Sequence, residues 1–227
     1  IPFFDQDTGI IRPHQNVQSR PQFKPERSLD TAVVLGVLHS LGSDLLVSPG
    51  SDWVIHTAHQ MQKAFQGMYP INDNVSDPNP AIGRYPEDAD GKGHPWVLTT
   101  AAFAELQYRM AHVLLYSEEI KINEWNHPLF SKALRDQGVG DLIEAGQTLR
   151  PDQEMFRQLL LGLKKQGDLY LTRLKVHTPQ DGSMAEQFNR YHGFPESAPH
   201  KTTSYAAFIK AVLARADLMA DLPPKPR

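Results

Sequence analysis

A polar segment before the middle of the chain, residues 81–96 (AIGRYPEDADGKGHPW), contains the types of side chain that bind sugars. One cation, two carboxylates and two aromatic rings stand close together in it: Arg84, Glu87, Asp88, Tyr85 and Trp96. Carboxylates and guanidinium groups bind pairs of hydroxyl groups through charge-assisted, often bidentate hydrogen bonds. Aromatic faces can cover the apolar C–H faces of a pyranose ring. The alternative that these residues leave open is a structural ion pair between Arg84 and Asp88.

A second polar segment, residues 181–199 (DGSMAEQFNRYHGFPESAP), has neither a helical nor a strand period and stands just before a strong helical pattern. Its middle carries Glu186 and Gln187, followed by the polar or aromatic Asn189, Arg190 and Tyr191. A carboxylate on such a loop can act as a general base or a nucleophile at an anomeric carbon, or it can simply cap a turn. Because active sites gather on loops that a rigid scaffold holds, the two segments together predict a sugar site.

The scaffold for these loops is predicted to be all-α. Helical patterns cover residues 28–42, 51–70, 95–116, 122–138, 150–174 and 203–220, and no alternating strand pattern of any length appears. The first and third are apolar almost all round, which is typical of buried helices, whereas 51–70 and 122–138 are amphipathic. Such alternation favours two concentric layers of helices over a simple bundle. An α-solenoid is the second interpretation, since no residue signature repeats at a fixed period.

Composition excludes several classes of partner. The 227 residues carry a formal net charge of −3, which does not suit a polyanion, so we expect no nucleic-acid partner. No apolar run of about 18 residues exists, so we expect no membrane-spanning helix. Cysteine is absent, which excludes disulfides, iron–sulfur clusters and thiolate zinc sites.

Two weak metal signals are interpreted as structural. His56 and His59 lie three apart on one predicted helix without an acidic third ligand at the usual spacing, so we expect both on its polar face. The stretch DADGKG (88–93) lacks the downstream bidentate Glu of a calcium loop, so we expect a Gly-rich turn. No Walker or dinucleotide-binding loop is present. We therefore expect no cofactor and no metal.

The ends of the chain are predicted to lie outside the helical domain. Residues 1–28 are interpreted as an extended segment that wraps the surface, rather than as a basic arm for a partner, and residues 221–227 as a tail. There is no initiator Met and no signal-peptide layout, so we expect a processed or truncated chain. One glycosylation sequon, at Asn74, weakly supports a secretory route.

Several stretches resemble the fungal and yeast glucoamylase family. GRYPED (83–88) with PW (95–96), and then DGSMAEQFNRYHGFPESAP followed by SYAAF (204–208), resemble family signatures in the right order. SLDTAVVLGVLHS (28–40) and AFQGMYPIN also resemble family segments. The resemblance implies an (α/α)6 toroid, with residues 29–220 forming the C-terminal half of the catalytic domain. It also implies inverting exo-hydrolysis of α-1,4-glucans, such as starch, glycogen and maltooligosaccharides, with release of β-D-glucose from non-reducing ends.

The same resemblance implies roles for individual residues. Glu186 matches the general base of the family, and Arg84 and Asp88 match residues that line the sugar subsites. Trp96 matches an aromatic residue near those subsites. Tyr85 and Gln187 match neighbours that shape the site. The family habit implies a secreted or vacuolar location.

Departures from the family pattern limit this expectation. The chain has no Trp-Glu dipeptide, which carries the general acid in the family, and no W-x-R-D segment. We therefore expect it to lack the general-acid half of the toroid and to need that half as a partner. Thr203 stands where the family usually has Trp before the last helix. The alternative is a non-catalytic sugar-binding or scaffold domain, as in glucoamylase-like regulatory subunits of phosphorylase kinase.

Overall fold

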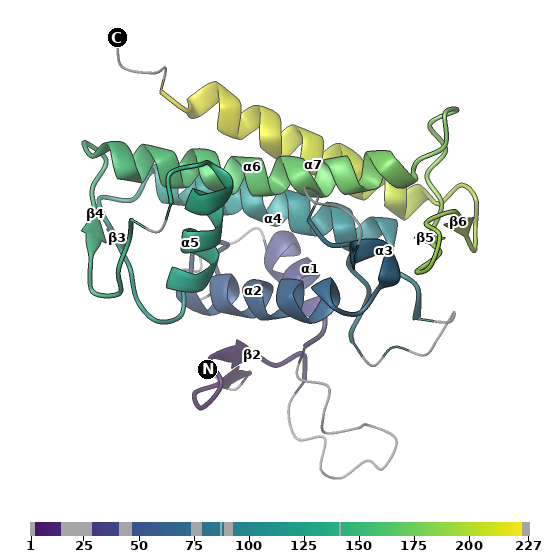
Figure 1. Ribbon diagram of the computed structural model, residues 1–227, viewed down its shortest axis with the longest axis horizontal. Helices are drawn as coiled ribbons and strands as arrows, with labels where there is room; N and C mark the ends of the chain where they lie inside the picture. The colour runs from purple at the N-terminus through teal and green to yellow at the C-terminus, as the bar shows by residue number, and fades with distance from the viewer. Residues whose placement is uncertain are drawn as a thin grey trace.

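The computed structural model describes residues 3–14, 29–40, 47–73, 79–86, 88, 93–140 and 142–223. Within them the chain is mostly helical (Figure 1). The helices are α1 (Ala32–His39), α2 (Asp52–Gln66), α3 (Pro70–Asp73), α4 (Val97–Leu115), α5 (His127–Asp136), α6 (Glu154–His177) and α7 (Thr202–Asp221). None of these helices is long and apolar enough to cross a membrane.

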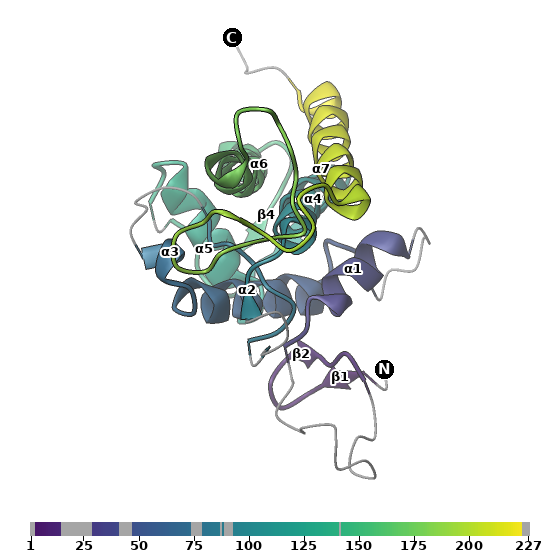
Figure 2. The ribbon, with the colours of Figure 1, turned by 90° about the vertical axis from the view of Figure 1, so that its right-hand side faces the viewer.

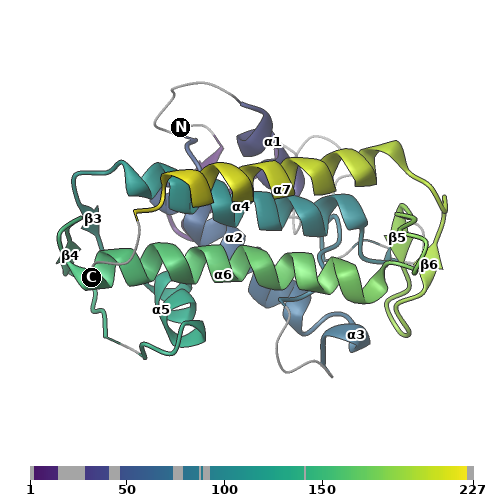
Figure 3. The same ribbon diagram turned by 90° about the horizontal axis from the view of Figure 1, so that it is seen from above.

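In the described residues, very short strands form three antiparallel pairs. They are β1 (Phe4–Asp5) with β2 (Ile10–Ile11), β3 (Ile120–Lys121) with β4 (Thr148–Leu149), and β5 (Gln187–Phe188) with β6 (Pro195–Glu196). Two residues are too few to show a period of two, which is why the sequence pattern contains no strand signal. The pairs β3–β4 and β5–β6 lie at opposite ends of the long helices (Figure 3).

Helix α4 is the centre of the molecule. Most of its nineteen residues are buried, as the apolar pattern of residues 95–116 predicts. Seen along the helix axes, α6 and α7 lie on one side of it and α1 and α2 on the other (Figure 2). A helix without a polar face can be stable in water only when neighbours surround it.

Helix α1 differs from its prediction. Residues 28–42 were expected to be buried all round, but only Val34, Val37 and Leu38 of α1 are buried, and Gly36 is exposed. The prediction of burial on every side is therefore wrong for this helix. Among the described residues α1 packs on α4 and α2, so its opposite side has no helix to cover it.

A short helix follows the end of α2. The helix predicted over residues 51–70 ends at Gln66 in the structure. Pro70 then begins α3, because proline lacks the N–H that the first turn of a helix leaves unpaired. The side chain of Asn72 donates to the carbonyl of Phe65 at 2.7 Å and so fastens α3 to the end of α2.

The N-terminal segment forms a hairpin over α2 in its described part. Phe4 stacks on Trp53 with ring centroids 4.0 Å apart, and the N–H of Ile11 donates to the hydroxyl of Thr57 at 3.0 Å. Residues 15–28 of the predicted extended segment lie outside the described residues.

Side-chain ties fix α7 along α4. At the far end from β5 and β6, the hydroxyl of Tyr116 donates to Asp221 at 2.7 Å, and Nε2 of His112 lies 2.8 Å from the same carboxylate oxygen. Midway, Asp168 of α6 accepts hydrogen bonds from Tyr108 of α4 and Arg215 of α7. The three long helices are therefore held in a fixed register.

Close backbone approach between α5 and α6 gives a stability prediction. A Cβ added at Gly162 would lie 2.5 Å from the carbonyl oxygen of Ala133, whereas one added at exposed Gly36 would meet nothing within 4 Å. Gly162→Ala should lower the free energy of unfolding by about 2 kcal/mol through overpacking. Gly36→Ala should raise it by about 0.5–1 kcal/mol through helix propensity. Urea unfolding followed by circular dichroism measures both, and equal effects would contradict the close approach.

Candidate functional site

Backbone pairing joins the two polar segments. Trp96 and Gln187 form an antiparallel β-bridge, the N–H of Val97 donates to the carbonyl of Glu186 at 3.2 Å, and the N–H of Phe188 donates to that of Pro95 at 3.2 Å. Segments that are about ninety residues apart in the sequence therefore lie side by side at the start of α4. This arrangement puts Glu186 next to the loop that carries Arg84.

Glu186 is held through both of its carboxylate oxygens. The ammonium nitrogen of Lys201 lies 2.7 Å from Oε1, and the hydroxyl of Ser197 donates to Oε2 at 2.5 Å. The side chain is 17% exposed, so the carboxylate is largely enclosed but still reaches solvent. The hydrogen bond from Lys201, then that from Ser197, lowers the pKa of Glu186 below its ordinary value, and the charge of Arg84 acts in the same direction. Glu186 is therefore an ionised carboxylate paired with side chains, which differs from the turn cap considered above.

Ser197 reaches Glu186 from a backbone conformation that side chains rarely adopt. Its φ is 64°, in the left-handed region, and among the described residues it is the one non-glycine residue there. Its neighbour Ala198 accepts a hydrogen bond from the N–H of Glu186 at 2.9 Å. Such conformations persist where surrounding contacts fix them, and they cluster at functional sites.

Arg84 and Asp88 form a bidentate ion pair. Nε and Nη2 of Arg84 donate to the two oxygens of Asp88 at 2.7 and 2.8 Å. The Asp88 side chain is 3% exposed and that of Arg84 is 33% exposed, so one partner is buried and the other borders solvent. The guanidinium also lies over two rings, 5.3 Å from the centroid of Trp96 and 5.5 Å from that of Tyr85. The structural ion pair between Arg84 and Asp88, which the sequence left open as an alternative, is therefore present. It lies beside Glu186.

The predicted site residues differ in their access to solvent. Arg84, Trp96 and Glu186 are partly exposed, whereas Tyr85, Asp88 and Gln187 are buried. Glu87 lies outside the described residues. The buried members can still orient the exposed ones, as Asp88 orients Arg84, but in this structure solvent hardly reaches them.

Sequence reasoning missed both residues that hold Glu186. Ser197 lies inside the quoted loop and Lys201 directly before the SYAAF helix, yet nothing in their spacing marks them as partners of Glu186. Thr203 stands where the glucoamylase family usually has Trp. It is exposed and borders an apolar groove lined by Leu35 and Leu98. The residue of this segment that contacts Glu186 is Lys201.

The histidine prediction is wrong for His56. His56 is 8% exposed, Nδ1 of its ring is 3.3 Å from the carbonyl oxygen of Trp125, and the two rings meet edge to face. It is buried because Trp125 packs over this side of α2. Burial, and then the charges of His56 and Lys63, lowers the pKa of His59 to about 4.

In the part of the chain that the structure describes, no three His, Asp or Glu side chains are grouped as metal ligands. Residues 89–92 of the DADGKG stretch lie outside that part.

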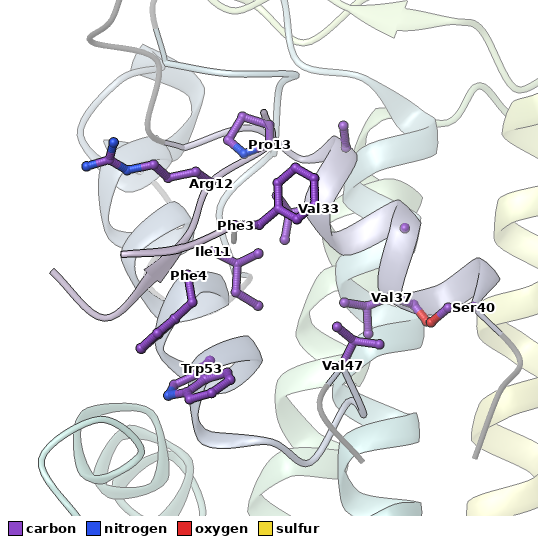
Figure 4. A pocket seen from close by; sticks show the side chains of 12 residues that line it. Phe3, Phe4, Ile11, Arg12, Pro13, Val33, Val37, Ser40, Val47 and Trp53 are labelled. Atoms are coloured by element: carbon purple, nitrogen blue, oxygen red, sulfur yellow. The ribbon is translucent and has the colours of Figure 1, made fainter. Parts of the chain in front are cut away.

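A separate cavity of about 340 Å³ lies between the N-terminal hairpin, α1 and α2 (Figure 4). Its lining is mostly apolar, with Phe3, Ile11, Val33, Val37 and Trp53 facing the space. A sugar needs several hydrogen-bonding partners, and this cavity offers few. It is therefore a poor candidate for the sugar site that the loops predict.

Comparison with known protein families gives a match over almost the whole chain. A model described as "Glycosyl hydrolases family 15" matches residues 3–213, nearly the whole chain.

Individual relatives agree with that match. The chain is 34% identical over 199 residues to "Glucoamylase" of Blastobotrys adeninivorans, covering 83% of this chain and 31% of that protein. A solved glucoamylase of Saccharomycopsis fibuligera has a TM-score of 0.83 at 27% identity and covers 97% of this chain and 46% of its own. The solved glucoamylase of Hypocrea jecorina has a TM-score of 0.80 at 29% identity, and the match covers 98% of this chain and 36% of that one. The chain thus spans about a third of that curated relative, and its fold is part of an (α/α)6 toroid.

The Arg84–Asp88 pair predicts a local contribution to stability. Arg84→Gln would leave the buried Asp88 carboxylate without its bidentate partner and should cost about 2 kcal/mol of unfolding free energy. Arg12→Gln breaks the pair with Asp5, where Arg12 is 57% exposed, and should cost clearly less than Arg84→Gln. Chemical denaturation of both variants tests this difference, and similar losses would mean that Asp88 is not stabilised by its pairing.

Proposed function

Because this chain belongs to glycosyl hydrolase family 15, we propose that it supplies the general base of a glucoamylase-type, exo-acting glycosidase. The substrates are α-1,4-glucans, that is starch, glycogen and maltooligosaccharides, and the product is β-D-glucose from their non-reducing ends. The observation that carries the proposal is the carboxylate of Glu186, held at both oxygens by Lys201 and Ser197 next to Arg84. The resemblance also implies a secreted or vacuolar location, which forms part of the proposal.

In the proposed reaction Glu186 accepts a proton from a water molecule. The water attacks the anomeric carbon on the face opposite the leaving oxygen, so the configuration inverts. The base must be ionised to do this, and the lowered pKa of Glu186 supports that state. Arg84 would donate to sugar hydroxyls from its exposed side, and the ring of Trp96 would lie against the sugar. Tyr85, Asp88 and Gln187 would keep these groups in place.

The general acid is proposed to come from outside this chain. Inversion requires a second carboxyl about 6.5–9.5 Å from the base, which protonates the leaving oxygen. The outer side of α7 supports a missing partner, since large apolar side chains are exposed on it: Ile209 54%, Val212 40%, Leu213 56% and Met219 45%. An apolar surface of this kind marks an interaction site. We propose that the remaining helices of the toroid cover it and bring the acid.

One observation favours the alternative function. Lys201 neutralises the charge of Glu186 and occupies one of its oxygens. A carboxylate that serves only to pair with a lysine would suit a non-catalytic sugar-binding or scaffold domain. The two functions differ in whether hydrolysis depends on Glu186.

The activity prediction uses maltoheptaose as substrate. The purified chain should release glucose when it is mixed with the part of the Blastobotrys adeninivorans glucoamylase that lies outside the match, because that part would supply the acid. Proton NMR should show β-glucose first. Glu186→Gln should lower the rate by about 10²–10⁴-fold.

Glu196→Gln is the matched control, since it removes the same charge from the same hairpin and keeps the acceptor for Asn189. It should leave the rate nearly unchanged. Release of α-glucose first, or full activity of Glu186→Gln, would contradict the proposed base. Binding of maltoheptaose without any hydrolysis would favour the non-catalytic domain.

The exposed side of α7 gives a second prediction. The chain alone should self-associate through its apolar side chains, and Leu213→Lys should reduce this association without loss of helix content. Leu142→Lys, at a residue that is 59% exposed in a loop away from α7, is the control. Sedimentation velocity measures the association. An equal effect of both variants would show that α7 is not the surface involved.

A further inference from the structure

Lys201 is attached to the same loop that carries Glu186. It is the residue directly before α7, and its N–H donates to the carbonyl of Met184 at 2.9 Å. Three residues later, the hydroxyl of Ser204 donates to the carbonyl of Ala185 at 2.8 Å. The start of α7 is thus bonded to the two residues that precede Glu186, which fixes the position from which the lysine side chain extends.

Two cations act on Glu186, and they differ in how their own charge is compensated. Arg84 faces it from the loop before α4 but is bound bidentately to Asp88. Lys201 faces it from the start of α7 and is paired with Glu186 itself. Ser197, from the end of the β5–β6 hairpin, adds an uncharged donor at the other oxygen. Lys201 is therefore the charge most closely coupled to this carboxylate.

We propose that Lys201 is a positioning residue for the general base. It holds Glu186 as an oriented carboxylate and thereby sets the lowest pH at which Glu186 can accept a proton from water. The inference rests on the proposed role of Glu186. Holding Oε1 at Lys201 and Oε2 at Ser197 fixes the plane of the carboxylate, so the remaining lone pairs have fixed directions.

This arrangement has an electrostatic consequence with a definite sign. A cation within about 4 Å favours the ionised carboxylate and lowers its pKa. Replacing it by a neutral side chain removes that effect, so the pKa of Glu186 should rise towards its ordinary value. The base would then be protonated over more of the acid range, where it cannot accept a proton from water.

The test follows the ionisation of Glu186 directly. Carbon-13 NMR of the side-chain carboxyls is recorded against pH in the whole chain, and Glu186→Gln identifies the signal by its loss. Lys201→Met should raise the titration midpoint by about one pH unit, and Lys201→Arg should restore it. Lys175→Met removes the same charge at an exposed position of α6 and should leave the midpoint unchanged. Circular dichroism confirms that each variant is folded.

A midpoint that stays the same in Lys201→Met, or that rises equally in Lys175→Met, would overturn the inference. The second measurement uses the mixture with the part of the Blastobotrys adeninivorans glucoamylase that is proposed to supply the acid. In it, the acid limb of the profile of kcat/KM against pH should move to higher pH by the same amount in Lys201→Met. A purely structural lysine would change the rate at all pH values without moving the limb. Absence of hydrolysis from the wild-type mixture counts against the proposed function, and the titration then decides about Lys201.

Discussion

Helix α4 has no polar face, and this constraint organises the rest of the chain. A nineteen-residue helix is about 28 Å long, and leaving an apolar surface of that length in water would be strongly unfavourable. Helices α1, α6 and α7 therefore pack on it, and α2 lies on the same side as α1. The chain enters α4 at Trp96, so the candidate site forms where the enclosed helix begins and the polar loops meet.

The helices could be predicted from the sequence because they depend on local patterns, and the two polar segments expected to form the candidate site do lie side by side. All six predicted helical segments contain a helix. The partial exposure of α1 could not be predicted, because it depends on which helices are its neighbours. The burial of His56 has a similar cause, since Trp125 reaches it from a segment sixty-nine residues away. The hydrophobic periodicity of a sequence describes one helix at a time and carries no information about which elements pack against it.

The contacts of Glu186 were beyond sequence reasoning for a further reason. Ser197 faces the carboxylate from a left-handed backbone conformation, which a serine in the sequence does not signal. Lys201 faces it because two hydrogen bonds fasten the start of α7 to the residues before Glu186: the N–H of Lys201 donates to the carbonyl of Met184, and the hydroxyl of Ser204 donates to the carbonyl of Ala185. The role proposed for Glu186 came from a family signature. The charges that surround it came from the three-dimensional arrangement.

Helix α7 is attached at both ends, and this limits how the chain can change in length. Its start is bonded to the loop of Glu186, and Asp221 at its end is hydrogen-bonded to His112 of α4 and to Tyr116 directly after α4. Inserting or deleting one residue between these ties would turn one end relative to the other by about 100°. The two attachments could then not form together. Insertions within α7 should therefore be poorly tolerated.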